Sequence, residues 1–185
     1  GEAGQRKLFA AKVLIIGAGG LGSPAPMYLA ASGIGEIGIV DDDVVDLSNL
    51  QRQIAHRTAD IGRKKAESMA ATLAALNSDV QLNTYRERIS EDNIEDILCD
   101  CGYDFVLDCT DNFPAKFLIN DAYVRLNKSF SHAGVTGFSV QIMTVVPQRG
   151  SCYRCIFEDV PDEGTVPTCC KVGVLGAVVG VVGSL

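Results

Sequence analysis

Four glycines between Gly17 and Gly22 have the spacing of a phosphate-binding loop. The segment GAGGLG places them at Gly17, Gly19, Gly20 and Gly22, directly after an aliphatic run, and matches G-x-G-x-x-G. In that pattern the first glycine permits a tight turn, the second lets backbone N–H groups approach a phosphate, and the last allows close helix–strand packing. The N-terminus of the following helix favours the phosphate charge. Alone, the pattern predicts a nucleotide, as in dehydrogenases, and a tight turn without a ligand is the alternative.

A second group of polar residues follows the next predicted strand, which ends at Asp41. An acid about twenty residues after the loop usually binds a ribose hydroxyl, which NAD would also satisfy. The group continues with Asp43, Asn49, Arg52, Gln53 and Lys65. Cations beside the loop favour a triphosphate, because its developing charge must be neutralised. The alternative is that Arg52, Lys64 and Lys65 are solvated surface residues, and Lys64 fits that alternative better.

Strands and helices alternate along the chain, which predicts an α/β fold in a single domain over 1–185. We expect strands at 12–16, 36–41, 80–85, 103–108, 129–135 and 139–147, and helices at 23–32, 63–77, 91–100, 113–128 and 172–185. This order implies a Rossmann-like, mostly parallel sheet with helices on both faces, extra C-terminal strands and a Cys-x-x-Cys loop. Ligands lie beyond the carboxyl ends of such strands, so segments 17–22, 41–52 and 108–112 should converge on one crevice.

Composition and charge exclude several classes of protein. The net charge of -7 argues against a general nucleic-acid surface. The N-terminus lacks the apolar segment of a signal peptide, and the apolar run 172–185 is too short to cross a membrane. We expect that run to be a buried helix. Seven cysteines without a secretion signal indicate a reducing compartment, so we expect a cytoplasmic protein.

Four motifs in order resemble the MoeB/ThiF/HesA family, sulfur-carrier adenylyltransferases related to ubiquitin-activating enzymes. They are GAGGLGSP at 17–24, VDDDVVDLSNLQRQ at 40–53, GRKKAES at 62–68 and LDCTDN at 107–112, and the similarity covers essentially the whole chain. The resemblance implies that Asp41 binds the ribose, that Asn49 and Arg52 hold the phosphates, that Lys65 contacts a phosphate, and that Asp111, beside Asn112, helps to hold Mg²⁺.

The reaction implied by the resemblance joins ATP to a ubiquitin-like sulfur carrier that ends in Gly-Gly, in molybdopterin, thiamine or related sulfur transfer. The carrier's terminal carboxylate attacks the α-phosphate, which gives an acyl-adenylate and pyrophosphate. A carboxylate needs no general base, so positioning and charge neutralisation are the whole task. We therefore expect His56 and His132 to be structural or near the site.

The cysteines carry separate expectations. The resemblance implies that Cys152 and Cys155 are half of a structural Zn²⁺ site whose other half lies further toward the C-terminus. It also marks Cys169, four residues before Gly173, as a thiol that attacks the adenylate or bonds to the carrier; an inert loop thiol is the alternative. Three others, Cys99, Cys101 and Cys109, are expected to be small core residues.

The resemblance also implies a homodimer, in which an N-terminal helix carries an arginine into the partner's site. That helix and the family's C-terminal region are expected to be missing from 1–185. Two other functions stay open: a family member acting on a small molecule or tRNA, or a non-catalytic binding module like the inactive halves of heterodimeric activating enzymes. The net charge weighs against tRNA, and the intact Arg52, Lys65 and Asp111 argue against the non-catalytic module.

Overall fold

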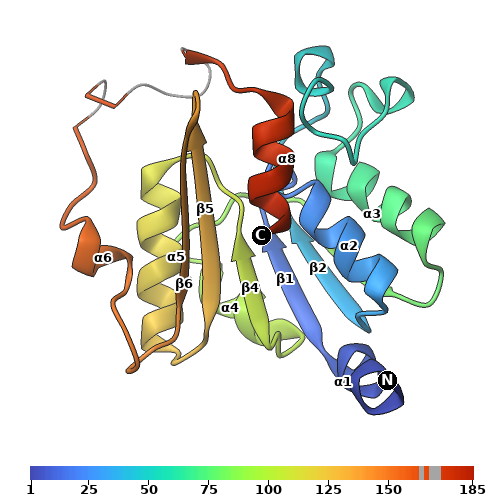
Figure 1. Cartoon of the computed structure of the whole chain (residues 1–185), viewed down its shortest axis with the longest axis horizontal. Helices are drawn as coiled ribbons and strands as arrows, with labels where there is room; N and C mark the ends of the chain where they lie inside the picture. Colours follow the sequence, from blue (N-terminus) through green and yellow to red (C-terminus); the bar gives the residue numbers. More distant parts are fainter. Residues whose placement is uncertain (163–164, 167–171) are drawn as a thin grey trace.

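A six-stranded sheet forms the centre of the computed structural model, which describes residues 1–162, 165–166 and 172–185 (Figure 1). The strand order is β3-β2-β1-β4-β5-β6. The strands are β1 (Lys12–Ile16), β2 (Glu36–Val40), β3 (Gln81–Tyr85), β4 (Phe105–Asp108), β5 (Phe130–Thr136) and β6 (Ser139–Val145). The first five are parallel, and β6 pairs antiparallel with β5. The mostly parallel sheet and its extra C-terminal strands are therefore confirmed.

Helices cover both faces of the sheet, as Figure 1 shows. They are α1 (Glu2–Ala10), α2 (Pro24–Ser32), α3 (Lys65–Leu76), α4 (Ile94–Asp100), α5 (Phe113–Arg125), α6 (Tyr153–Ile156) and α8 (Gly176–Ser184), with 3₁₀ turns η1 (Leu47–Asn49) and η2 (Thr58–Asp60). Successive side chains of a strand point to opposite faces. Accordingly, Val13 and Ile15 of β1 pack with α2 and α3, whereas Leu14 and Ile16 pack with α4 and α5.

Three expectations about individual segments need correction. Residues 2–10 form α1, which sequence analysis did not identify. The apolar C-terminal run does form a helix, α8, but only one side is buried: Val179 and Val182 pack inward while Val181 is exposed. The Cys-x-x-Cys segment is not a loop, because Tyr153–Ile156 forms the short helix α6. Of the helices that the structure describes, none is both long and apolar enough to cross a membrane.

The cysteines expected in the core differ from one another. Cys99, near the end of α4, is exposed, so its assignment as a core residue is wrong. Cys101 and Cys109 are half-buried and pack against the apolar clusters. Burial raises the pKa of the Cys109 thiol to about 12, so this thiol stays protonated at neutral pH.

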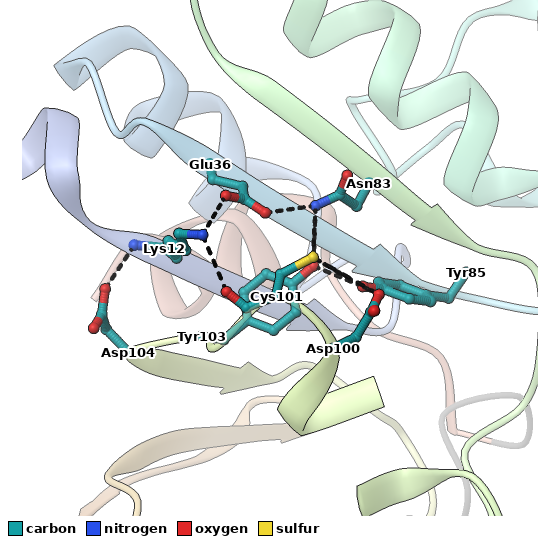
Figure 2. A network of polar contacts seen from close by, with 8 residues as sticks. All are labelled: Lys12, Glu36, Asn83, Tyr85, Asp100, Cys101, Tyr103 and Asp104. Carbon is teal, nitrogen blue, oxygen red and sulfur yellow. Dashed lines mark hydrogen bonds and ion pairs between the residues drawn. The ribbon is translucent and has the colours of Figure 1, made fainter. Parts of the chain in front are cut away.

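A polar network lies on the α4 face of β1, β2 and β3 (Figure 2). Lys12 Nζ is 2.9 Å from a carboxylate oxygen of the buried Glu36, and Asn83 Nδ2 donates to the other at 2.7 Å. Burial alone would raise the pKa of Glu36, but the hydrogen bonds from Lys12, Cys101 and Asn83 leave it below its usual value. The Cys101 sulfur lies 3.3 Å from Asn83 Nδ2, so this thiol packs among polar groups.

Gly38 of β2 makes room for this network, because a Cβ there would collide with the ring of the buried Tyr103. We expect Gly38→Ala to lower the free energy of unfolding by about 2–3 kcal/mol, the cost of overpacking a core. Gly134 in β5 is the matched control, since a Cβ there would meet no atom within 4 Å. Gly134→Ala should be neutral or slightly stabilising. Urea denaturation of both variants checks the prediction, and equal effects would contradict it.

Candidate nucleotide-binding site

The glycine loop turns tightly from β1 into α2. Gly17 has a φ of 101°, and its N–H donates to Val40 O at 2.9 Å. A Cβ on Gly17 would lie 2.8 Å from the carbonyl oxygen of Cys109, and a Cβ on Gly22 would overlap the carbonyl oxygen of Gly17. Both positions therefore require glycine because of the backbone beside them, which includes the end of β4.

The middle of the loop leaves backbone donors available. Within the described residues, the N–H groups of Gly19 and Gly20 donate to no other group. A Cβ on Gly19 would meet a single residue within 4 Å, Gln53, at 3.7 Å. These N–H groups lie in the loop that leads into α2, and because unpaired backbone N–H groups in such a loop attract anions, this arrangement is suited to a phosphate.

Asp41 follows β2 and is bonded to the loop. Its carboxylate accepts hydrogen bonds from Ala18 N at 2.7 Å and Asp43 N at 2.9 Å. Burial raises the pKa of Asp41 above its usual value, although these bonds and the nearby Lys65 charge oppose the shift. A carboxylate can accept further hydrogen bonds beyond these two, so Asp41 could also accept one from a ligand hydroxyl.

The segment after Asp41 carries the next group of candidates. Asn49 Oδ1 accepts from Asp46 N at 3.2 Å within the capped turn η1, so part of this side chain is used locally. Arg52 donates to Ser48 O at 3.2 Å, and its Cγ would lie 3.4 Å from a Cβ on Gly20. Gln53 is buried, and its Oε1 has no hydrogen-bond partner among the described residues. Arg52 and Gln53 thus border the loop, and Asn49 lies one turn before them.

Lys65 is the buried cation of the site. Its side chain is only 8% exposed, and its Nζ lies 2.8 Å from Asp43 Oδ2. The alternative of a solvated surface residue is therefore wrong for Lys65. Lys64 is half-buried, and its Nζ donates to Asp42 O at 2.6 Å.

The end of β4 supplies one free carboxylate. Asp108 is buried and bonded to Thr110 and Lys116. Asn112, and not Asp111, is the N-cap of α5, and its side chain accepts from Ala115 N at 3.0 Å. Asp111 is exposed and makes no hydrogen bond or ion pair with the described residues. Mg²⁺ is commonly held by one or two carboxylates plus phosphate oxygens, which fits this single acid.

His132 lies on β5, in register with Asp108 at the end of β4, and contacts α6. Its ring packs edge-on against Tyr153, with 4.7 Å between ring centres. Burial, with a smaller contribution from Lys116, lowers the pKa of His132 to about 4. His132 is thus packed among buried side chains, and its Nδ1 has no hydrogen-bond partner among the described residues.

Acid should therefore destabilise the fold through His132. Its folded-state pKa of about 4 lies below the unfolded value, so the unfolded chain binds more protons and stability falls as the pH drops from about 6.5 toward 4. At pH 5 the loss from this residue is about 2 kcal/mol. His132→Phe keeps an aromatic ring against Tyr153 and removes the titration. Urea denaturation at pH 7 and 5 should show the smaller loss in the variant, and parallel losses would contradict this account.

Cys152 and Cys155 form the other candidate site. Their sulfur atoms are 3.6 Å apart, close to the separation of about 3.8 Å for two thiolates on one tetrahedral Zn²⁺. The segment is fixed on α5, because Tyr153 N donates to Asn120 Oδ1 at 2.8 Å and Arg154 pairs with Asp121. In the described part of the chain, no third histidine, cysteine or acid joins them in a metal-binding group. Cys169 lies outside the described residues.

Comparisons with known proteins agree on one family. The model described as "ThiF family" matches residues 1–185. The chain is 45% identical over 185 residues to the SAMP-activating enzyme E1 of Haloferax volcanii, covering 100% of this chain and 67% of that protein. It is 46% identical over 183 residues to the adenylyltransferase and sulfurtransferase MOCS3 of Mus musculus, covering 99% and 39%. It is 42% identical over 190 residues to the sulfur carrier protein adenylyltransferase of Thermus thermophilus, covering 100% and 69%.

Solved structures of Escherichia coli MccB share the fold. The structure with ATP has a TM-score of 0.82 and 28% identity, covering 97% of this chain and 54% of that one. The structure with MccA-N7isoASN has a TM-score of 0.85 and 26% identity, covering 97% and 55%. The chain therefore spans about half of MccB, and between 39 and 69% of the three relatives above.

Proposed function

Because the chain belongs to the ThiF family, we propose that it adenylates the C-terminal glycine of a ubiquitin-like sulfur carrier with ATP. Its relatives are named adenylyltransferases, and MccB was solved with ATP. The observation that carries the proposal is the buried Lys65, which is linked through Asp43 and Asp41 to the glycine loop. A buried cation at that position suits a triphosphate better than a dinucleotide, whose pyrophosphate a helix N-terminus already serves.

In the proposed complex, backbone N–H groups, Asp41 and the cationic side chains each bind a different part of ATP. There, Gly19 and Gly20 donate N–H groups to phosphate oxygens and Asp41 accepts from a ribose hydroxyl. Arg52 and Lys65 neutralise phosphate charge, and the remaining polar groups of Asn49 and Gln53 complete the site. Lys65 Nζ lies 2.8 Å from Asp43, so this pair compensates the buried charge, and a phosphate would compete with Asp43 for Lys65.

The proposed reaction needs no proton transfer to start. A carboxylate oxygen of the carrier bonds to the α-phosphorus of ATP, and the bond from that phosphorus to the bridging oxygen of the β-phosphate breaks. The products are the acyl-adenylate and pyrophosphate. Fixed donors and cations stabilise the charge that develops on the phosphate oxygens. Asp111, with Asn112 beside it, would hold Mg²⁺, which supplies further charge neutralisation when bound.

Three finer features belong to the same proposal. Cys152 and Cys155 would provide two of the four ligands of a structural Zn²⁺. Cys169 would attack the acyl carbon of the adenylate, which forms a thioester bond to the carrier and releases AMP. A homodimer is supported by exposed apolar residues on and beside β6, namely Phe138, Val140, Ile142 and Val146, since contiguous exposed apolar surface often marks an interface.

ATP–pyrophosphate exchange tests the proposal, measured with and without ubiquitin-like proteins that end in Gly-Gly. We expect exchange only with a matching carrier, and none with that carrier lacking its last glycine. Exchange without any protein partner would instead indicate a small-molecule substrate. ATP binding without exchange would indicate a binding module, and failure to bind ATP would overturn the assignment of the site.

A further inference from the structure

His56 connects the glycine loop to the first turn of α3. It lies in the segment between β2 and α3, and the residue is only 6% exposed. Nε2 is 2.9 Å from the carbonyl oxygen of Ala18, and Nδ1 is 2.8 Å from the hydroxyl of Ser68. Ser68 comes three residues after Lys65 on α3. The imidazole therefore bridges the two elements that carry the proposed phosphate contacts.

The partners of His56 define its tautomer. A carbonyl oxygen can only accept a hydrogen bond, so Nε2 carries the proton and donates to Ala18. On the neutral ring Nδ1 is then an acceptor that faces the Ser68 hydroxyl, and this hydroxyl also interacts with the Asp60 carboxylate. Burial lowers the pKa of His56, and the Lys65 charge acts in the same direction. The neutral ring that this arrangement requires is thus the favoured form at neutral pH.

The bond to Ala18 also orients the next donor in the loop. The Ala18 carbonyl and the Gly19 N–H belong to one peptide group, and in a planar trans peptide they point in opposite directions. With the carbonyl held by His56, the Gly19 N–H must point away from the ring. Ala18 is held on its other side as well, since its own N–H donates to Asp41 at 2.7 Å. Among the described residues, the Gly19 N–H has no acceptor.

We propose that His56 is a positioning residue for nucleotide binding, which holds the Ala18–Gly19 peptide so that the Gly19 N–H faces a phosphate. The inference rests on the proposed function, because it assumes that the loop binds ATP. Glycine adopts many backbone conformations at little cost, so the loop alone does not fix this peptide. The imidazole restrains the orientation of this peptide through its bond to Ala18 O. The contact between Ser68 and Nδ1 keeps the ring turned so that Nε2 faces the loop.

Two substitutions separate positioning from mere packing. His56→Leu fills most of the volume without a donor, whereas His56→Gln places an amide N–H near the position of Nε2. We expect His56→Leu to weaken ATP binding by about ten- to hundredfold, the loss of one hydrogen bond to a charged group. His56→Gln should recover binding to within about threefold of the natural chain. Titration calorimetry with ATP and Mg²⁺, without a carrier, measures both on protein shown to be folded by circular dichroism.

The outcomes distinguish this inference from the function on which it rests. If the natural chain does not bind ATP, the proposed function fails and the inference fails with it. If the natural chain binds ATP and His56→Leu binds equally well, the positioning role alone is overturned. Equal weakening in both variants would also overturn it, because the donor would not matter. A ¹⁵N–¹H spectrum of the imidazole gives an independent readout: a proton on Nδ1 instead of Nε2 would contradict the bond to Ala18.

Discussion

Asp111→Ala should lower carrier-dependent ATP–pyrophosphate exchange by about a thousandfold, corresponding to about 4 kcal/mol of transition-state stabilisation. The reason is the proposed role of Asp111, which would hold Mg²⁺ beside the triphosphate. Without this carboxylate, the Mg²⁺ that neutralises phosphate charge would be held less well. We expect Asp111→Ala to leave the fold and its stability nearly unchanged. Asp111 is exposed and bonded to none of the described residues, and substitutions at such positions usually change stability by less than about 0.5 kcal/mol.

Two controls test the role of Asp111: a substitution at another exposed acidic residue, and an assay of Asp111→Asn at a higher Mg²⁺ concentration. Asp92 is also exposed, at the start of the segment that leads into α4, so Asp92→Ala removes the same charge from a distant place. It should leave exchange unchanged. In Asp111→Asn, more Mg²⁺ should restore part of the activity, because the amide oxygen is a weaker ligand. Unchanged ATP–pyrophosphate exchange in Asp111→Ala would contradict the proposed role in binding Mg²⁺. A large loss of stability would instead show that Asp111 supports the fold.

The sequence predicted the strands, the glycine loop and the main helices because local patterns determine them. Aliphatic runs such as Val13–Ile16 form buried strands, and Asp41 follows directly because the strand ends at Val40. Neighbouring backbone atoms leave no room for a Cβ at Gly17 and Gly22. The glycines of the motif were therefore enough to predict this tight turn. The family resemblance, carried by four motifs in order, is confirmed over residues 1–185.

Other features could not be predicted because they depend on contacts between distant segments. No residue of α1 is buried, and Leu8 and Phe9 are the only large apolar residues among its nine, so a sequence this short and polar does not show the repeated apolar positions that mark a helix. The burial of Lys65 and the bridge through His56 both depend on how the segment after β2 folds against the loop. Asp111 and Asn112 are equally suitable caps by residue type, and the observed backbone places Asn112 at the cap. The exposure of Cys99 likewise follows from the orientation of α4.

Gly19→Ala should weaken ATP binding by at least about a hundredfold while the fold stays intact. Gly19 is not in the left-handed region, and its Cβ would touch only the end of Gln53 at 3.7 Å, so alanine fits the fold. The added methyl group would stand where a phosphate must approach the backbone. Titration calorimetry with ATP and thermal unfolding measure the two effects separately.

Gly22→Ala provides the opposite case from the same motif. Its Cβ would overlap the carbonyl oxygen of Gly17, and because this neighbour is backbone, the turn from β1 into α2 would have to move. We expect Gly22→Ala to lower the free energy of unfolding by about 3 kcal/mol or more. One glycine would thus serve the ligand and the other the fold, although the sequence pattern treats them alike. If Gly19→Ala bound ATP normally, the loop would not approach a phosphate there, and the assignment of this loop as the nucleotide site would fail.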